Sequence, residues 1–159
     1  MKYSKLPPEE MLYVEATKDD AEILSGVAKR SKRHWGYSKE AMEIWNQSLT
    51  ITEDFLNTHT VIKAMLEDEV VGFFALEEIK PVTRVAQYWI DTPYMRKGFG
   101  SEMFKYAKKF LMDNDVIAIT LLLDPNGLNF FKNRGAKVLD KVKHKNSNYF
   151  LYIVEVPIS

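Results

Sequence analysis

The chain contains no cysteine, and its three histidines, His34, His59 and His144, are scattered among 159 residues. Without cysteine it can form neither a disulfide nor a thiolate metal site, and it has no cysteine nucleophile. The three histidines lack the close spacing of a zinc site, so we expect no metal. A reducing, cytoplasmic location fits this composition, and we expect it.

The chain also lacks net charge and long apolar runs. It holds 22 Lys+Arg against 22 Asp+Glu, which gives a formal charge of zero. Dedicated nucleic-acid binders concentrate positive charge for phosphate contacts, so we expect no nucleic-acid partner. The start "MKYSKLPPEEMLYV" has no apolar signal-peptide core, and runs such as "VIAI" and "LLL" are too short to span a bilayer, so we expect no membrane partner.

The balanced total hides an uneven distribution of charge. Residues 1–80 hold 10 Lys+Arg against 15 Asp+Glu, whereas residues 81–159 hold 12 against 7. One interpretation is that the second half suits a polyanionic ligand and the first half a cationic one. The alternative is an accidental distribution of solvated charges, and the sequence leaves both open.

What is present is enough apolar material for one domain, with 46% hydrophobic and 13% aromatic residues. No repeat, low-complexity tract or long linker divides it, so we expect a single domain over 1–159 with its core at about 11–156. Alternation and helical spacing predict a mixed α/β chain. The expected strands are 11–16, 60–66, 70–78, 82–91, 116–123, 136–144 and 148–156. The expected helices follow Thr17 and Ser38 as caps, begin near Phe99, and carry Phe130 and Phe131.

Three of these strands carry particular expectations. Residues 60–66 and 70–78 flank an acidic turn and predict an antiparallel hairpin. "VIAITLLL" (Val116 to Leu123) is apolar without alternation, which is typical of a central strand covered on both faces.

The stretch "RKGFGSEMF" (Arg96 to Phe104) sets Gly98 and Gly100 directly before a helical pattern. Such a turn lets the backbone approach a ligand, and the helix start directs N–H groups and positive dipole at it, which suits a phosphate. A dinucleotide-binding turn would need a third glycine where Met103 stands. A nucleotide triphosphate loop would need four residues between its glycines and then Lys-Ser/Thr, which are absent.

Two motifs together resemble a third family, the GCN5-related N-acetyltransferases (GNAT), which bind acetyl-CoA. "YWIDTPYMRKGFGSEMF" resembles the family's strand, pyrophosphate loop and helix, and "LLLDPNGLNFFKNRGAKV" resembles its next strand and cofactor-side helix. "SKRHWGYSKEAM" is similar to the helix-to-helix region of an uncharacterised bacterial branch. The resemblance implies one domain with a mixed six- or seven-stranded sheet and helices on both faces. It also implies acetyl transfer to a primary amine.

Three positions depart from the family's usual pattern. The loop commonly begins with Gln or Arg, where this chain has Met95, and Arg96 stands where glycine is frequent. The second motif usually ends Phe-Tyr, and that tyrosine often protonates the departing thiolate, but this chain has Phe131. A thiol with a pKa of about 8.5 is a reasonable leaving group as the thiolate, so we expect turnover to be slower but not abolished. A CoA-binding regulatory or interaction module that has lost turnover is the alternative.

The resemblance also implies where the ligands bind. The strands ending near Asp91 and Leu123 should splay apart and receive the pantetheine arm. The cofactor residues so implied are Trp89, Ile90, Asp91, Met95, Arg96, Lys97, Gly98, Phe99, Gly100, Ser101, Asn126, Phe130 and Phe131. The acceptor pocket would take His34, Trp35 and Tyr37, and the general base would be Glu77, Glu78 or His34. The resemblance also implies that the acceptor is a small-molecule or peptide amine, and members of the family often form homodimers.

Overall fold

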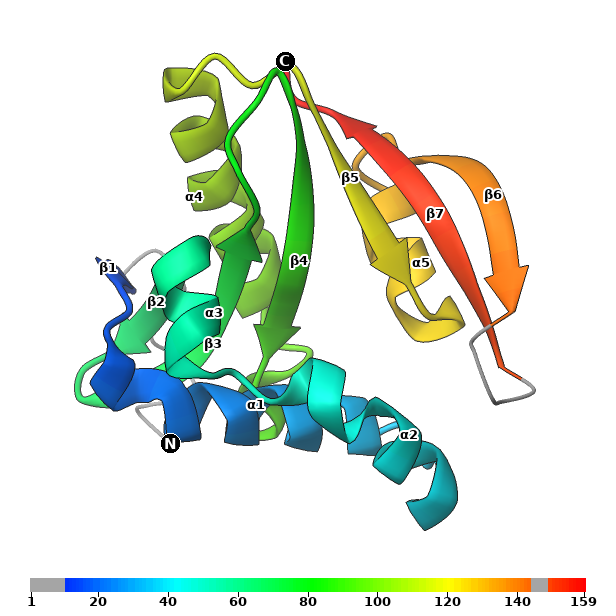
Figure 1. The fold of residues 1–159 in the computed structure, drawn as a ribbon. Coiled ribbons are helices and arrows are strands. Elements are labelled where there is room, and N and C mark those ends of the chain that lie inside the picture. The colour runs from blue at the N-terminus through cyan, green and yellow to red at the C-terminus, as the bar shows by residue number, and fades with distance from the viewer. Residues whose placement is uncertain (1–10, 144–148) are drawn as a thin grey trace.

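In the computed structural model, which describes residues 11–143 and 149–159, one seven-stranded mixed sheet runs through the protein (Figure 1). The strand order is β1-β2-β3-β4-β5-β7-β6. Neighbours are antiparallel except β4 and β5, which are parallel. The bounds are β1 Leu12–Glu15, β2 Thr60–Leu66, β3 Glu69–Leu76, β4 Val82–Ile90, β5 Ala118–Leu123, β6 Lys137–Lys143 and β7 Phe150–Pro157.

The helices begin where side chains cap them. Ser38 accepts from the Ala41 N–H at the start of α2, and Asp124 accepts from the Asn126 and Gly127 N–H groups at the start of α5. The bounds are α1 Ala21–Arg33, α2 Lys39–Leu49, α3 Glu53–Thr58, α4 Phe99–Asp113 and α5 Pro125–Lys132, with short 3-10 turns η3 Lys18–Asp20 and η4 Thr92–Tyr94.

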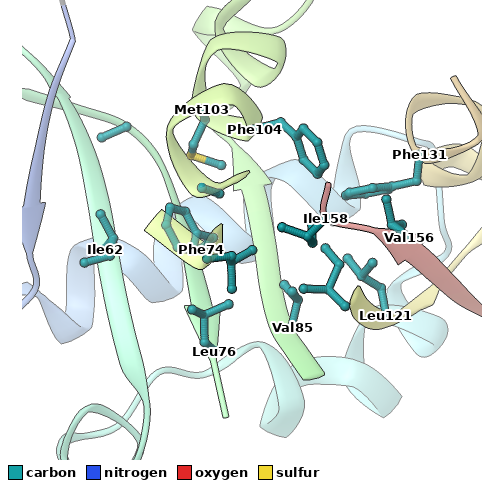
Figure 2. Packing of buried hydrophobic residues seen from close by; sticks show 14 of the residues in the cluster. Ile62, Phe74, Leu76, Val85, Met103, Phe104, Leu121, Phe131, Val156 and Ile158 are labelled. Atoms are coloured by element: carbon teal, nitrogen blue, oxygen red, sulfur yellow. The ribbon is translucent and has the colours of Figure 1, made fainter. Parts of the chain in front are cut away.

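Two apolar clusters lie on opposite faces of the sheet. The larger joins α4 and α5 to the sheet, and Figure 2 shows Met103 of α4 near Phe74 and Phe104 of α4 near Phe131. The smaller joins α1 and α2 to β2 and β3 and contains Leu24, Val27, Trp45, Phe73 and Ala75. Phe73 and Phe74 are adjacent on β3 and enter different clusters, as the alternation of a strand requires.

The parallel strands β4 and β5 pair over only three residues. Val82 pairs with Ala118, Thr83 with Ile119 and Arg84 with Thr120, and beyond that point the two strands diverge (Figure 1). On its other side β4 stays paired with β3 as far as Ile90. The gap therefore opens along one edge of β4, and the expected splay of these two strands is confirmed.

The expected mixed fold, strand positions and hairpin of β2 and β3 are confirmed, whereas the expectation that residues 116–123 are covered on both faces is wrong. Ile119 and Leu121 are buried in the larger cluster, but Leu122 on the other face is 44% exposed. The reason is that α1 packs against β3 and β4. His144 and residue 148, at the ends of two expected strands, lie outside the described residues.

The turn before α1 forms the capping box expected from Thr17 and Asp20. The Thr17 N–H donates to Asp20 Oδ2 and Lys63 Nζ donates to Asp20 Oδ1, both at 2.8 Å. Burial alone would raise the pKa of Asp20, but the hydrogen bonds from Lys63 and Thr17 outweigh it and hold this pKa below its usual value.

We therefore expect Asp20→Asn to lower the free energy of unfolding at pH 7 by about 1–2 kcal/mol. The asparagine side chain can still accept from the Thr17 N–H, but Lys63 loses its negatively charged partner. A carboxyl whose folded pKa is lowered stabilises the fold above its unfolded pKa of about 4 and loses this contribution as pH falls through the folded pKa. Urea unfolding of both proteins should show a gap that closes in acid. A gap that is constant with pH would contradict this role.

Candidate active site

A cavity of about 560 Å³ occupies the gap between β4 and β5. Its wall includes Lys32, Trp35 and Trp45 from the side of α1 and α2, and Gly100 and Phe130 from α4 and α5. Since these helix pairs belong to the clusters on opposite faces of the sheet, the cavity reaches both faces through the gap. Two molecules entering from opposite sides can meet there.

The glycine turn forms the end of the cavity where α4 begins. Arg96 and Gly98 have positive φ angles of 62° and 88°, and Gly98 is the N-cap of α4. Such left-handed residues turn successive N–H groups to one side, and the first N–H groups of the helix add to them. A Cβ at Gly100 would stand in ordinary contact with two side chains, 3.4 Å from Phe130 and 3.6 Å from Ile90. The turn has the form of an anion cradle.

The main chain of β4 presents alternate residues to the gap. The Asp91 N–H donates to the Val71 carbonyl of β3 at 2.8 Å, so it faces away from the gap. By the alternation of a strand, the main-chain groups of Tyr88 and Ile90 face the gap instead. A bulge precedes them, because Ala75 pairs with Gln87 and Leu76 with Val85, which leaves Ala86 as the extra residue.

Three consecutive residues of α1 tie the free ends of the two strands. The Ser31 hydroxyl donates to the Ile90 carbonyl at 2.7 Å, and Arg30 donates two hydrogen bonds to Asp91 at 2.8 and 3.0 Å. Lys32 Nζ lies 2.7 Å from Asp124 Oδ2, directly after β5. We call Arg30, Ser31 and Lys32 the clasp. It holds β4 and β5 at a fixed separation.

The Lys32–Asp124 pair is nearly enclosed, with side chains 8% and 11% exposed. The ammonium lies 4.2 Å from the centre of the Trp45 ring and 5.0 Å from that of Tyr37. The pKa of Tyr37 is raised to about 12, chiefly by burial and then by the Asp124 charge. The Asn126 side chain donates to the Tyr37 hydroxyl at 3.0 Å. This network links α1, α2 and α5 at one side of the cavity.

On the α4 and α5 side, the cavity wall is aromatic. Phe131 is buried and lies edge-on to Tyr88 and Phe130, with ring centres 5.3 and 4.9 Å away. The Tyr88 hydroxyl donates to the Gly100 carbonyl at 2.7 Å, and burial raises its pKa well above the ordinary value. Arg134 stacks on Phe130 at 3.6 Å and donates to the Ser101 hydroxyl at 2.5 Å.

Most of the cofactor residues expected from the sequence meet in this cavity. Those in its wall are Trp89, Ile90, Met95, Arg96, Gly98, Gly100, Ser101, Asn126, Phe130 and Phe131. Asp91, Lys97 and Phe99 are outside the wall. The Asp91 carboxylate is held by Arg30, Lys97 is exposed, and the Phe99 ring is buried against Tyr94.

The expected acceptor and base residues are brought together less well. Trp35 lines the cavity, whereas His34 is exposed and lies edge-on to Trp35. Tyr37 is outside the cavity wall, with its ring next to Lys32 Nζ. Glu77 and Glu78 follow the end of β3, outside the cavity wall. Glu77 forms an ion pair with Arg84, which does line the cavity, and Glu78 is exposed.

Lys32 was not predicted as a site residue, although the sequence of α1 carries a signal for it. Leu24, Val27 and Ala28 form its buried stripe, and the same spacing continues to Ser31 and Lys32. Polar residues at core positions need buried partners, which Ile90 and Asp124 supply. Tyr88, Gln87 and Arg84 were also missed.

Neither a metal centre nor a membrane span is found in residues 11–143 and 149–159. No group of three or more His, Cys, Asp or Glu residues in these ranges could hold a metal ion. No helix within them is long and apolar enough to cross a bilayer.

A splayed parallel strand pair with an anion cradle at one end defines a protein that binds an extended, phosphate-bearing carrier. The chain matches the acetyltransferase (GNAT) family over residues 15–136, and it belongs to that family, whose co-substrate is acetyl-CoA. The expectation of an acetyl-CoA-dependent N-acetyltransferase is thereby confirmed at the level of the family.

Solved structures share the fold at low sequence identity. PaiA N-acetyltransferase from Thermoplasma acidophilum, in complex with coenzyme A, is 20% identical, with a TM-score of 0.76 over 92% of this chain and 98% of that one. The ribosomal-protein-S18-alanine N-acetyltransferase of Escherichia coli is 11% identical, with a TM-score of 0.70 over 94% of each chain. A spermidine N-acetyltransferase chimera from Vibrio cholerae and hSSAT is 12% identical, with a TM-score of 0.68 over 94% of this chain and 96% of that one. No curated protein sequence shows significant similarity to the chain.

Proposed function

We propose that this protein transfers the acetyl group of acetyl-CoA to a primary amine by direct attack, with no acyl-enzyme. The observation that carries the proposal is the cavity that crosses the sheet through the gap between β4 and β5. Acetyl-CoA would enter from the α4 and α5 side and the amine from the α1 and α2 side. When bound, acetyl-CoA supplies a thioester carbonyl for the amine to attack.

The residues fit this co-substrate at both ends of the gap. The main-chain N–H groups from Gly98 to Ser101, with Arg96 beside them, would hold the pyrophosphate. The main-chain N–H and carbonyl of Tyr88 and the N–H of Ile90 would pair with the amides of the pantetheine arm, since they are turned away from β3 and the Ile90 carbonyl already accepts from Ser31. Asn126, Phe130 and Phe131 would line that arm from α5.

The bulge in β4 supplies the remaining element of the chemistry. Ala86 is the extra residue there, and it lines the cavity. A main-chain N–H at this point would stabilise the negative charge that develops on the carbonyl oxygen, an effect of about 3 kcal/mol per donor in other acyl-transfer enzymes. We propose this position for the oxyanion donor because the bulge releases it from the ladder with β3.

The attacking amine must lose a proton, because an alkyl ammonium has a reference pKa near ~10.4. Of Glu77, Glu78 and His34, Glu77 is favoured, because its ion-pair partner Arg84 reaches the cavity wall. We propose that Glu77 accepts the proton through water. Glu78 is exposed, and His34 meets the wall at the indole ring of Trp35, which does not accept a proton.

Thiol release from acetyl-CoA should therefore depend on an added primary amine, with an acetylated product detectable by mass spectrometry. We expect Glu77→Gln to lower kcat about 100-fold and to flatten the pH profile, while the dissociation constant of CoA stays unchanged. His34→Ala is the matched control and should retain turnover. Equal loss in both variants, or loss in His34→Ala alone, would contradict the assignment of Glu77.

One observation favours a second candidate, a CoA-binding regulatory or interaction module. Phe131 has no hydroxyl where the family usually has a tyrosine, and the neighbouring Tyr88 hydroxyl is bonded to Gly100. The same assay separates the two functions. Tight CoA binding with thiol release that no amine accelerates would favour the module.

A further inference from the structure

The part of the cavity wall that would face the amine is built around indole rings. We call Lys32, Trp35, Trp45, Arg84, Gln87 and Trp89 the acceptor wall. Trp89 donates its ring N–H to Gln87 at 2.5 Å, and Gln87 in turn donates to the Ser48 carbonyl at 3.0 Å. These bonds fix the ring, and Trp35, which also lines the cavity, is 42% exposed. Flat apolar faces therefore border the space for the acceptor.

The charges on this wall are unsuited to a polycation. Among the described residues that line the cavity, Asp124 is the one acid, and Lys32 occupies it at 2.7 Å. Arg84 also lines the cavity, whereas its partner Glu77 does not. The acidic first half of the sequence therefore contributes no unpaired carboxylate to the acceptor wall.

From this wall we infer that the acceptor is a primary monoamine with an apolar body, an arylalkyl amine or alkylamine rather than a polyamine. The inference rests on the N-acetyltransferase function proposed above. A second ammonium would lose its hydration against the tryptophans and find no unpaired carboxylate, because Asp124 is held by Lys32 and Glu77 by Arg84. A carboxylate on the acceptor would have to displace Asp124 from Lys32 or Glu77 from Arg84.

Three amines with six carbons each test this inference: hexylamine, 1,6-diaminohexane and 6-aminohexanoate. They differ at the far end, which is apolar, cationic or anionic. We expect kcat/KM for hexylamine to exceed that of either charged analogue by about tenfold or more, because the charged end stays unpaired at the wall. We also expect 2-phenylethylamine to match or exceed hexylamine, because its ring packs on the tryptophans.

Two variants test whether the acceptor wall causes the preference for an apolar monoamine. Trp35→Ala should raise KM for 2-phenylethylamine about tenfold and leave the dissociation constant of CoA within about twofold. Ile23→Ala is its matched control, since Ile23 is 52% exposed on α1 and outside the cavity wall. Ser48→Asp should shift the preference toward 1,6-diaminohexane, because it adds a carboxylate at the cavity for the second ammonium.

The outcomes distinguish a failure of the inference from a failure of the proposed N-acetyltransferase function. If 1,6-diaminohexane or 6-aminohexanoate is the best acceptor, the inference is wrong while the N-acetyltransferase function stands. If no amine is acetylated although CoA binds, the proposed function fails. Saturation-transfer NMR on the CoA-loaded protein then still ranks the three amines, and binding of the diamine as tight as that of hexylamine would overturn the inference.

Discussion

Lys32→Met is expected to lower the free energy of unfolding by about 3 kcal/mol, because it leaves the nearly enclosed Asp124 carboxylate without its cation. Methionine keeps an unbranched stem of similar length, so packing against Trp45 is largely retained and the charge is what changes. Urea unfolding measures the loss. The dissociation constant of CoA should rise as well, because the end of β5 is no longer tied to α1.

The chain offers a matched control in Lys109, which pairs with Asp113 one turn along α4. Those side chains are 78% and 64% exposed, and exposed pairs of this kind contribute about 0.3–0.5 kcal/mol. Lys109→Met should therefore be nearly silent. Equal effects at Lys32 and Lys109 would contradict a special role for the clasp.

A double variant shows whether the effect belongs to the pair. Asp124→Asn can still cap α5 through its side-chain oxygen while removing the charge. Combined with Lys32→Met, it leaves no unpaired charge, so the double variant should be more stable than the sum of the single losses predicts. Strict additivity would show that Lys32 and Asp124 act independently.

The fold could be predicted from the sequence because its elements follow local rules. Each of these rules acts within a few residues. Examples are the helical spacing of Leu24 and Val27, the cap at Ser38 and the glycines on either side of Phe99. Helix α3 was missed because it has six residues and none is buried, so it leaves no apolar periodicity. The exposure of Leu122 was missed because it depends on where the helices end over the sheet.

The parts of the site that could be predicted are those formed by main-chain groups. The glycine turn and the ends of β4 and β5 are visible in local patterns and meet in the cavity. The clasp depends on hydrogen bonds between residues that lie 59 to 92 positions apart in the sequence, such as Lys32 and Asp124. No local sequence pattern indicates which residue is the partner. Glu77 and Glu78 were equivalent in sequence, and the contact with Arg84 separates them.

Gly98→Val is expected to weaken CoA binding about 100-fold, because the cradle depends on a left-handed residue at this position. A β-branched residue does not adopt the φ of 88° without strain, so the turn must change conformation and its N–H groups turn away from the pyrophosphate. Isothermal titration with CoA measures the effect. The free energy of unfolding should fall by only about 1–3 kcal/mol.

Gly36→Val provides the comparison, because Gly36 has nearly the same φ, 85°, and a Cβ there would meet nothing within 4 Å. Gly36 lies outside the cavity wall, in the connection between α1 and α2. Both variants carry similar backbone strain and should lose similar stability, yet only Gly98→Val should lose affinity for CoA. If the two variants bind CoA equally well, the turn at Gly98 does not hold the pyrophosphate, and the proposed direction of entry from α4 is wrong.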